Sequence, residues 1–295
     1  MANPVSQSAR KTLAIKNILY KILNTLLDPY PHRSFVIHLA KKYKPGSYEQ
    51  RLRIGAVERP HYGYCVYHSA KLAAKLGIKK ISVLEFGVAG GNGLLNLEYH
   101  IQEIEKILPV KISVFGFDTG SGLPNPIDFR DLPHRFKQSS YKMDIPALRA
   151  RLQKAVLVIG NVKDTTTNFF EEFDPAPIAA ILFDLDYYSS TVEALKIFDS
   201  NANENYFLPR VYCYFDDVLG TEVELYNDYV GERLAIREFN QTHTTKKISI
   251  SYHLLKHRVI EKWHHRIFIY HDFAHNRYND FVGSVEENDL SLEGE

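Results

Sequence analysis

The sequence has few cysteines, no excess of charge of one sign and no long apolar run. Cys65 and Cys213 are its only cysteines. Two cysteines exclude a disulfide framework, and no zinc-ligand spacing surrounds them. The 36 basic and 35 acidic residues leave a net charge of +1, so no bulk electrostatic attraction draws the chain to nucleic acid or to an anionic membrane. Because no run reaches about 18 apolar residues, we expect no membrane span and a cytoplasmic protein without a nucleic-acid partner.

The composition is that of a folded protein. Hydrophobic residues make up 45% of the chain and charged residues 24%, both ordinary values for globular domains. The length of 295 residues allows one large α/β domain or two small ones. The 19 Tyr and 17 Phe fill cores, and such residues also line pockets for flat or sugar-like ligands.

Residues 1–58 predict an N-terminal helical extension. The apolar residues that share one face of its first helix are Ile15, Ile18, Leu19, Ile22, Leu23, Leu26 and Leu27. Such a face packs on a partner surface, which is either the chain's own domain or a second subunit in a homodimer. Lys16 and Lys21 interrupt the apolar core that a signal peptide requires.

Residues 59–279 predict a second domain in which strands and helices alternate. Five short apolar runs, each followed by a helical pattern, lie at 81–86, 111–117, 155–159, 179–183 and 211–215. This repetition predicts a parallel sheet with helices on both faces. Two later runs, 247–254 and 266–273, predict an antiparallel pair. The expected fold is α/β, with a Rossmann-like, seven-stranded, mostly parallel sheet, an antiparallel C-terminal strand and a flexible acidic tail at 280–295.

Acids, amides and glycines follow the predicted strands. In open α/β sheets, ligands bind outside the carboxyl ends of the strands. The segments at those ends are 85–93, 118–122, 160–162, 184–186 and 216–217. The glycines of the first segment allow a ligand to approach the backbone where a helix begins. They match neither a dinucleotide fingerprint nor a phosphate loop.

Two acids indicate which ligand the glycine loop takes. Glu85 lies at the entry of the loop, where it would repel a pyrophosphate but suits a cation. Asp118 ends the second strand, at the place where an acid accepts hydrogen bonds from ribose hydroxyls. A nucleoside with a positively charged tail fits both residues, and S-adenosylmethionine (SAM) is such a molecule.

Four motifs within about residues 60–273 carry a resemblance to a known family. They are EFGVAGG at 85–91, FDTGSGLP at 117–124, FDLDYYSST at 183–191 and FDD at 215–217. In this order they resemble the class I SAM-dependent methyltransferases, and specifically the metal-dependent macrocin-type O-methyltransferases of natural-product sugars. The third motif together with the later pair of acids is the most specific part of the match.

The resemblance implies that Asp184, Asp216 and Asp217 bind Mg²⁺ or another divalent cation. The chemistry of these residues agrees, because three carboxylates at neighbouring strand ends repel one another unless a cation or protons neutralise them. Ligands that are all oxygen suit Mg²⁺ or Ca²⁺ rather than zinc.

The resemblance also implies the remaining site residues. Those expected to bind the cofactor are Glu85, Gly87, Gly91, Asp118, Thr119, Asn161 and Asp184. A metal orients and acidifies an acceptor hydroxyl, and a base then takes its proton. Asp186 is the first candidate for the base and His134 the second.

The acceptor is expected to be a small hydroxylated molecule, a sugar or another natural-product-like compound. Leu185 replaces the usual glycine of the family, and the polar insertion at 201–205 lengthens the interval between the acids. Both change the pocket walls, so a sugar diol, a catechol-like phenol and a hydroxylated peptide side chain stay open.

Two other interpretations stay open. One is a metal-independent SAM methyltransferase acting on nitrogen or a carboxylate, with Asp216 and Asp217 as hydrogen-bond acceptors; the other is a catalytically silent SAM-binding protein. The histidines near the C-terminus are expected to be surface or packing residues rather than a metal site. They are His253, His257, His264, His265 and His271.

Overall fold

The structure is a computed structural model that describes residues 31–199, 206–257 and 259–283. The apolar helix face expected at 15–27, and with it the homodimer contact, lies outside the described residues. So do the insertion at 201–205 and the tail from 284 onward. These expectations therefore stay predictions.

The chain divides into two compact units, Met1–Pro60 and His61–Glu295. The described part of the first unit contains the helices α2 (Pro31–Tyr43) and α3 (Tyr48–Arg53). A capping box starts α3, because the Ser47 hydroxyl accepts a hydrogen bond from the Gln50 N–H (3.2 Å) and the Gln50 side chain accepts one from the Ser47 N–H (3.0 Å). Such reciprocal bonds satisfy two backbone donors that a helix start otherwise leaves open.

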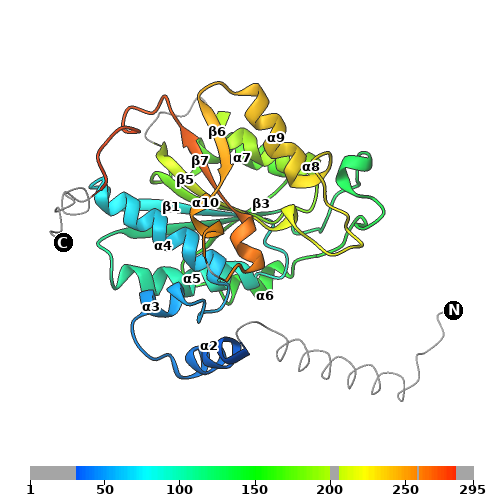
Figure 1. The fold of residues 1–295 in the computed structure, drawn as a ribbon. Coiled ribbons are helices and arrows are strands. Elements are labelled where there is room, and N and C mark those ends of the chain that lie inside the picture. The colour runs from blue at the N-terminus through cyan, green and yellow to red at the C-terminus, as the bar shows by residue number, and fades with distance from the viewer. Residues whose placement is uncertain (1–30, 200–205, 258, 284–295) are drawn as a thin grey trace, which may run out of the picture. The chain divides into compact units, whose positions relative to one another are not determined.

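The second unit is built on a seven-stranded sheet in the order β3-β2-β1-β4-β5-β7-β6 (Figure 1). Its strands are β1 (Lys80–Phe86), β2 (Lys111–Asp118), β3 (Val156–Ile159), β4 (Ile178–Phe183), β5 (Phe207–Phe215), β6 (Lys246–Ile250) and β7 (Ile267–Asp272). The first five strands pair in parallel, and β7 pairs antiparallel with both β5 and β6. The Rossmann-like, mostly parallel sheet with an antiparallel C-terminal strand is therefore confirmed.

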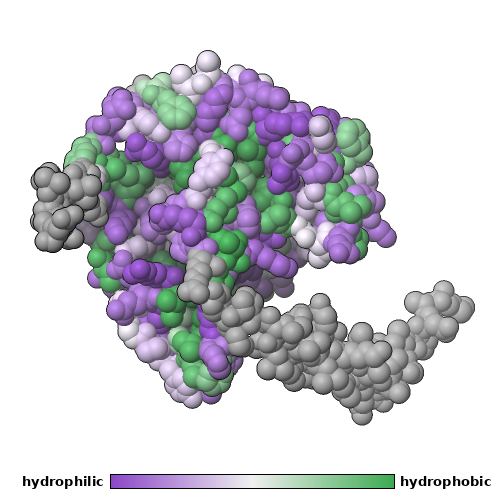
Figure 2. Space-filling view, in the orientation of Figure 1, coloured by the Kyte–Doolittle hydropathy of each residue, from purple (hydrophilic) through white to green (hydrophobic). Residues whose placement is uncertain are grey.

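Helices cover both faces of the sheet (Figure 1). They are α4 (Pro60–Lys75), α5 (Asn92–Glu105), α6 (Ile145–Arg149), α7 (Val162–Phe173), α8 (Tyr188–Leu195), α9 (Gly231–Thr242) and α10 (Tyr252–Leu255). Helices α4 and α5 lie on one face, and α7, α8 and α9 on the other. Hydrophilic residues cover the outer side of α9 in Figure 2, while its Leu234, Ala235 and Phe239 are buried. Among the described residues, no helix combines the length and apolarity needed to cross a membrane.

One predicted boundary is wrong. The run expected to form a single strand at 247–254 is split, because β6 ends at Ile250 and Tyr252–Leu255 forms α10. Leu254 is buried from this helical turn. An apolar residue can reach the core from a strand or from a helical turn, so the apolar pattern does not distinguish a strand from a helix here.

The order of the strands places a ligand crevice near β1. This strand lies between β2 and β4, so the chain proceeds outward in opposite directions on its two sides. Ligands of doubly wound sheets bind at such a switch point, outside the carboxyl ends of the strands.

Candidate functional site

Four phenylalanines form a row across the carboxyl ends of β2, β1, β4 and β5. Their neighbouring ring centroids are 4.5 Å apart for Phe117 and Phe86, 5.5 Å for Phe86 and Phe183, and 4.5 Å for Phe183 and Phe215. The strand register pairs the same residues, and all four rings are buried. This row fixes the relative positions of the four strand ends.

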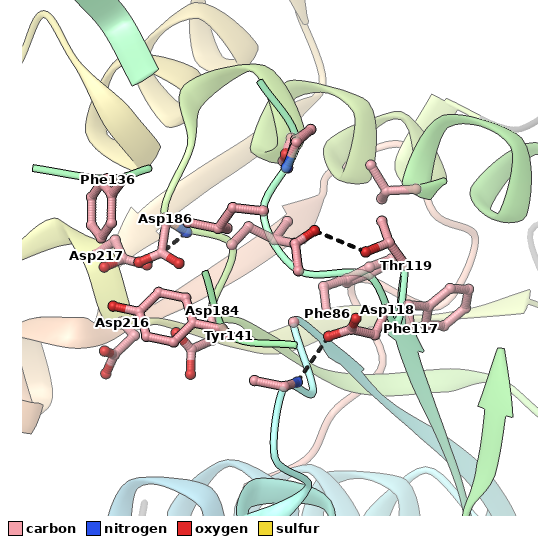
Figure 3. Close-up of a pocket in the computed structure, with 18 of the residues that line it drawn as sticks. Phe86, Phe117, Asp118, Thr119, Phe136, Tyr141, Asp184, Asp186, Asp216 and Asp217 are labelled. Atoms are coloured by element: carbon pink, nitrogen blue, oxygen red, sulfur yellow. Dashed lines mark hydrogen bonds between the residues drawn. The ribbon is translucent and has the colours of Figure 1, made fainter. Parts of the chain in front are cut away.

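The residue that follows each ring is therefore brought to one edge of the sheet. These residues are Asp118, Gly87, Asp184 and Asp216, and all four line a cavity of about 360 Å³. Figure 3 shows Asp118 on one side of this cavity and the aspartates of the β4 and β5 ends on the other. The signal for this row is present in the sequence, because each of the four motifs contains a phenylalanine directly before the residue that lines the cavity.

Asp118 closes the glycine loop. Its Oδ2 accepts hydrogen bonds from the backbone N–H groups of Val88 (3.0 Å) and Ala89 (2.8 Å), and its Oδ1 accepts one from the Gly120 N–H (2.6 Å). A carboxylate has about four lone-pair sites, so one acceptor position stays available for a ligand. Asp118 lies where the ribose of a nucleoside is expected, and it also holds the loop in shape.

Gly87 allows β1 and β4 to approach each other at the base of the cavity. It has a φ of +85°, and a Cβ atom at this position would lie 1.8 Å from the backbone oxygen of Asp184. The Asp184 N–H also donates to the Phe86 carbonyl (2.9 Å). Only glycine fits this close contact between the two strand ends.

Two of the expected cofactor residues do not line the cavity. Glu85 is buried and accepts a hydrogen bond from the Tyr62 hydroxyl (2.8 Å). A Cβ on Gly93 would lie 1.9 Å from the Glu85 carboxylate, so Glu85 supports the start of α5 from below. Gly91, at the N-cap of α5, has a φ of 81° and packs against Leu148.

Thr119 and Asn161, two of the residues expected to bind the cofactor, line the cavity. The Thr119 hydroxyl donates to the Gly122 carbonyl (3.0 Å). Asn161 is exposed, and its Oδ1 caps α7 by accepting a hydrogen bond from the Lys163 N–H (3.0 Å). Both residues shape loops that face the cavity.

The acids after β4 and β5 gather on one side of the cavity (Figure 3). Burial and the charges of Asp217 and its neighbours hold the pKa of Asp184 well above its ordinary value. Burial, followed by the charges of Asp217 and Asp216, raises the pKa of Asp186 to about 8. Burial and the Asp216 charge raise the pKa of Asp217 to about 6. The cluster therefore favours a bound cation or proton.

Asp217 is the best-connected member of this cluster. Its Oδ2 accepts a hydrogen bond from the Asp186 N–H (2.9 Å), and its Oδ1 accepts one from the Tyr226 hydroxyl (2.7 Å). Its own N–H donates to Oε2 of the buried Glu232 (2.8 Å). Sequence reasoning missed Tyr226 and Glu232, because no local pattern links residues 9 and 15 positions away to this aspartate.

Asp216 is held differently. Its Oδ1 accepts hydrogen bonds from the Arg266 guanidinium and the Tyr214 hydroxyl. A second Arg266 nitrogen donates to the Leu219 carbonyl. Arg266 thus places a positive charge at the edge of the acid cluster, a contact that no pattern in the sequence indicates.

The motifs imply a divalent cation at these carboxylates. Within the part of the chain that the structure describes, no group of three or more His, Cys, Asp and Glu side chains is arranged to hold a metal ion. The carboxylates nevertheless suit a hard cation in donor type and charge. Oε1 of Glu232 is buried without a hydrogen-bond partner among the described residues. The carboxylates therefore fit the ion chemically, but Asp216 would have to release its hydrogen bond with Arg266 before it could bind the ion.

The two candidates for the base lie in different surroundings. Asp186 lines the cavity beside Asp217, in a backbone conformation with a φ of 58°. His134 is exposed on the loop after β2 and does not line the cavity. The geometry brings Asp186, and not His134, to the acid cluster.

Asp131 anchors the long loop after β2, a role that the sequence did not indicate. It is buried, and its carboxylate accepts hydrogen bonds from the Ser189 N–H (2.8 Å), the Ser189 hydroxyl (2.9 Å) and the Ile127 N–H (2.8 Å). Ser189 belongs to the third motif. Asp131 therefore ties the loop to the start of α8, next to the acids.

No family model matches the chain, and no curated protein matches it. Similar solved structures include the O-methyltransferase NovP, with 14% identity over 72% of this chain and 79% of that one and a TM-score of 0.48. Another is the calicheamicin methyltransferase CalS11, with 21% identity over 72% and 85% and a TM-score of 0.43. A third is the O-methyltransferase TomG from Streptomyces achromogenes, with 14% identity over 72% and 79% and a TM-score of 0.39.

Proposed function

We propose that the chain is a SAM-dependent O-methyltransferase that acts on a hydroxyl of a small-molecule acceptor, a sugar or another natural-product-like compound. The observation that carries the proposal is one cavity with two unlike ends. The glycine loop closed by Asp118 lies at one end, and Asp184, Asp186 and Asp217 lie at the other. A nucleoside bound at the first end would direct its cationic tail toward the acids.

The chain's own residues then perform three tasks. Asp118 holds the loop against which the nucleoside packs. Asp184, Asp217 and, after release from Arg266, Asp216 would hold Mg²⁺ or another divalent cation. When bound, this ion lowers the pKa of an acceptor hydroxyl and fixes its orientation.

Asp186 is the residue proposed to accept the proton of the acceptor hydroxyl. It lies beside Asp217 on the cavity wall, within the same group of acids. A base at this place removes the proton while the acceptor oxygen is aimed at the methyl carbon, as an in-line displacement requires. His134 stays the alternative, and it would need its exposed loop to move.

A metal-independent transfer is the second candidate function. The Arg266–Asp216 contact favours it, because an internal cation already offsets one of the expected metal ligands. Under this alternative, Asp216 and Asp217 serve as hydrogen-bond acceptors for the substrate.

Release of S-adenosylhomocysteine tests the proposal. The purified protein is incubated with SAM and either catechol or methyl α-D-mannopyranoside, once with Mg²⁺ and once with EDTA. Turnover that requires Mg²⁺ supports the leading candidate, and equal turnover in EDTA supports the second. If an added amine or carboxylic acid is methylated while neither diol is, transfer to a hydroxyl is contradicted.

A further inference from the structure

Tyr141 is held in an unusual backbone conformation beside the cavity. Its φ is 62°, in the left-handed region. A bulky side chain rarely adopts this region, because its Cβ meets the following carbonyl. Two other non-glycine residues with positive φ, Ala89 and Asp186, also line the cavity. Such conformations persist where the surrounding structure imposes them, and they gather at functional sites.

Two backbone hydrogen bonds within the loop hold the residues that precede Tyr141. The Leu123 N–H donates to the Ser140 carbonyl (2.9 Å), and the Ser139 N–H donates to the Leu123 carbonyl (2.8 Å). Gly122 permits the contact, since a Cβ there would lie 2.3 Å from the Ser140 oxygen. The backbone that leads into Tyr141 is therefore held in one conformation.

This conformation carries the Tyr141 ring over the acid cluster. Figure 3 shows the ring beside Asp184 and Asp216, with its hydroxyl on the side of the aspartates. A phenolic hydroxyl carries its proton at neutral pH and can donate a hydrogen bond, and the Arg135 side chain interacts with this hydroxyl.

Core packing does not account for the strain. Tyr141 as a residue is 49% exposed, so it is not part of the packed core. An exposed aromatic ring and a protonated hydroxyl that face a cavity can instead contact a ligand from both an apolar and a polar side.

We propose that Tyr141 binds the methyl acceptor. Its ring packs against the methyl acceptor, and its hydroxyl donates a hydrogen bond to an oxygen of that molecule, next to the acid cluster. This inference rests on the proposed function. It assigns the loop after β2 to the acceptor half of the cavity, and it predicts acceptors that offer an oxygen beside a flat or apolar face.

Three substitutions separate the role of the ring from that of the backbone. Tyr141→Gly removes both the ring and the strain, Tyr141→Ala removes only the ring, and Tyr141→Phe removes only the hydroxyl. Lys44→Gly is the control, because Lys44 also has a positive φ (49°) but is exposed and does not line the cavity. We expect Tm to be higher for Tyr141→Gly than for Tyr141→Ala. Equal Tm values would mean that no strain is stored at this residue, which overturns the inference.

Binding and turnover complete the test. SAM affinity, measured by calorimetry, should be unchanged in all four variants. With catechol or methyl α-D-mannopyranoside, KM should rise about tenfold in Tyr141→Phe, the scale of one lost hydrogen bond, and at least as much in the Gly and Ala variants. The kcat should change less, and Lys44→Gly should resemble the wild type. An unchanged KM, or loss of SAM binding in Tyr141→Gly, overturns the inference. If the wild-type protein does not bind SAM, the proposed function itself fails, whereas the order of the Tm values still reports the strain.

Discussion

Replacement of Asp118 by alanine examines the end of the cavity assigned to the nucleoside. The substitution removes the acceptor of three backbone hydrogen bonds, from Val88, Ala89 and Gly120. A hydrogen bond to a charged group contributes roughly 1.5–3 kcal/mol when its loss leaves a buried donor unpaired. Asp118 is only partly buried, so water replaces part of this contribution. We therefore expect the free energy of unfolding to fall by about 2–4 kcal/mol.

Two assays measure the consequence. For a domain of this size, such a loss lowers Tm by about 4–16 °C, which thermal or urea unfolding detects. SAM affinity should fall by about 1–3 kcal/mol, the scale of a lost hydrogen bond to a partly buried group, and calorimetry would record this as a Kd about 5- to 150-fold higher.

Asp272→Ala is the matched control. Asp272 also ends a strand and is also partly buried, but it accepts a single backbone hydrogen bond, from Ala274 (3.1 Å), and does not line the cavity. This variant should lose about a third as much stability and bind SAM normally. An Asp118→Ala protein as stable as Asp272→Ala would refute the account of the loop, and unchanged SAM affinity would refute the placement of the ribose.

Three further predictions address the metal, the strand ends and the core. Mg²⁺ should raise the Tm of the wild-type protein, because an ion that binds only the folded state stabilises that state. In Asp217→Asn, Mg²⁺ should leave the Tm unchanged. The same rise in Tm in both proteins would exclude Asp217 as a metal ligand. Gly87→Ala should lower the free energy of unfolding by more than about 3 kcal/mol, because it adds a backbone collision to an unfavourable φ. Gly77→Ala should lower it by about 1 kcal/mol, because Gly77 has a φ of +71° but no atom within 4 Å of the added Cβ. Urea unfolding of both variants measures the difference, and equal losses would argue against the collision. Burial raises the pKa of the Cys65 and Cys213 thiols, so a thiol reagent such as DTNB should react with them only as the protein unfolds; rapid labelling of the native protein would show that this part of the core opens.

The sequence predicted the sheet because its strands are apolar runs separated by helical patterns. It also predicted which residues meet, since the carboxyl ends of parallel strands share one edge of a sheet. Asp118, Asp184, Asp186, Asp216 and Asp217 all lie at the cavity for this reason. The tertiary contacts of these acids were not predictable in the same way.

Arg266 and Glu232 illustrate the limit. Arg266 is 50 residues from Asp216 along the chain, and it reaches the site because β7 pairs with β5. Glu232 reaches Asp217 because α9 starts beneath the end of β5. The sequence shows that charges exist but not how these elements dock. The strain at Tyr141 depends in turn on the pairing of residues 123 and 139, which no periodic pattern indicates.

Calorimetric titration of the purified protein with SAM, in Mg²⁺ and in EDTA, shows whether this cavity binds the nucleoside. We expect saturable binding in the micromolar range under both conditions, because Asp118 and the glycine loop form the nucleoside end of the cavity, whereas the proposed metal ligands lie at the other end. Absence of binding under both conditions would contradict the assignment of this cavity to SAM, and with it the proposed methyl transfer.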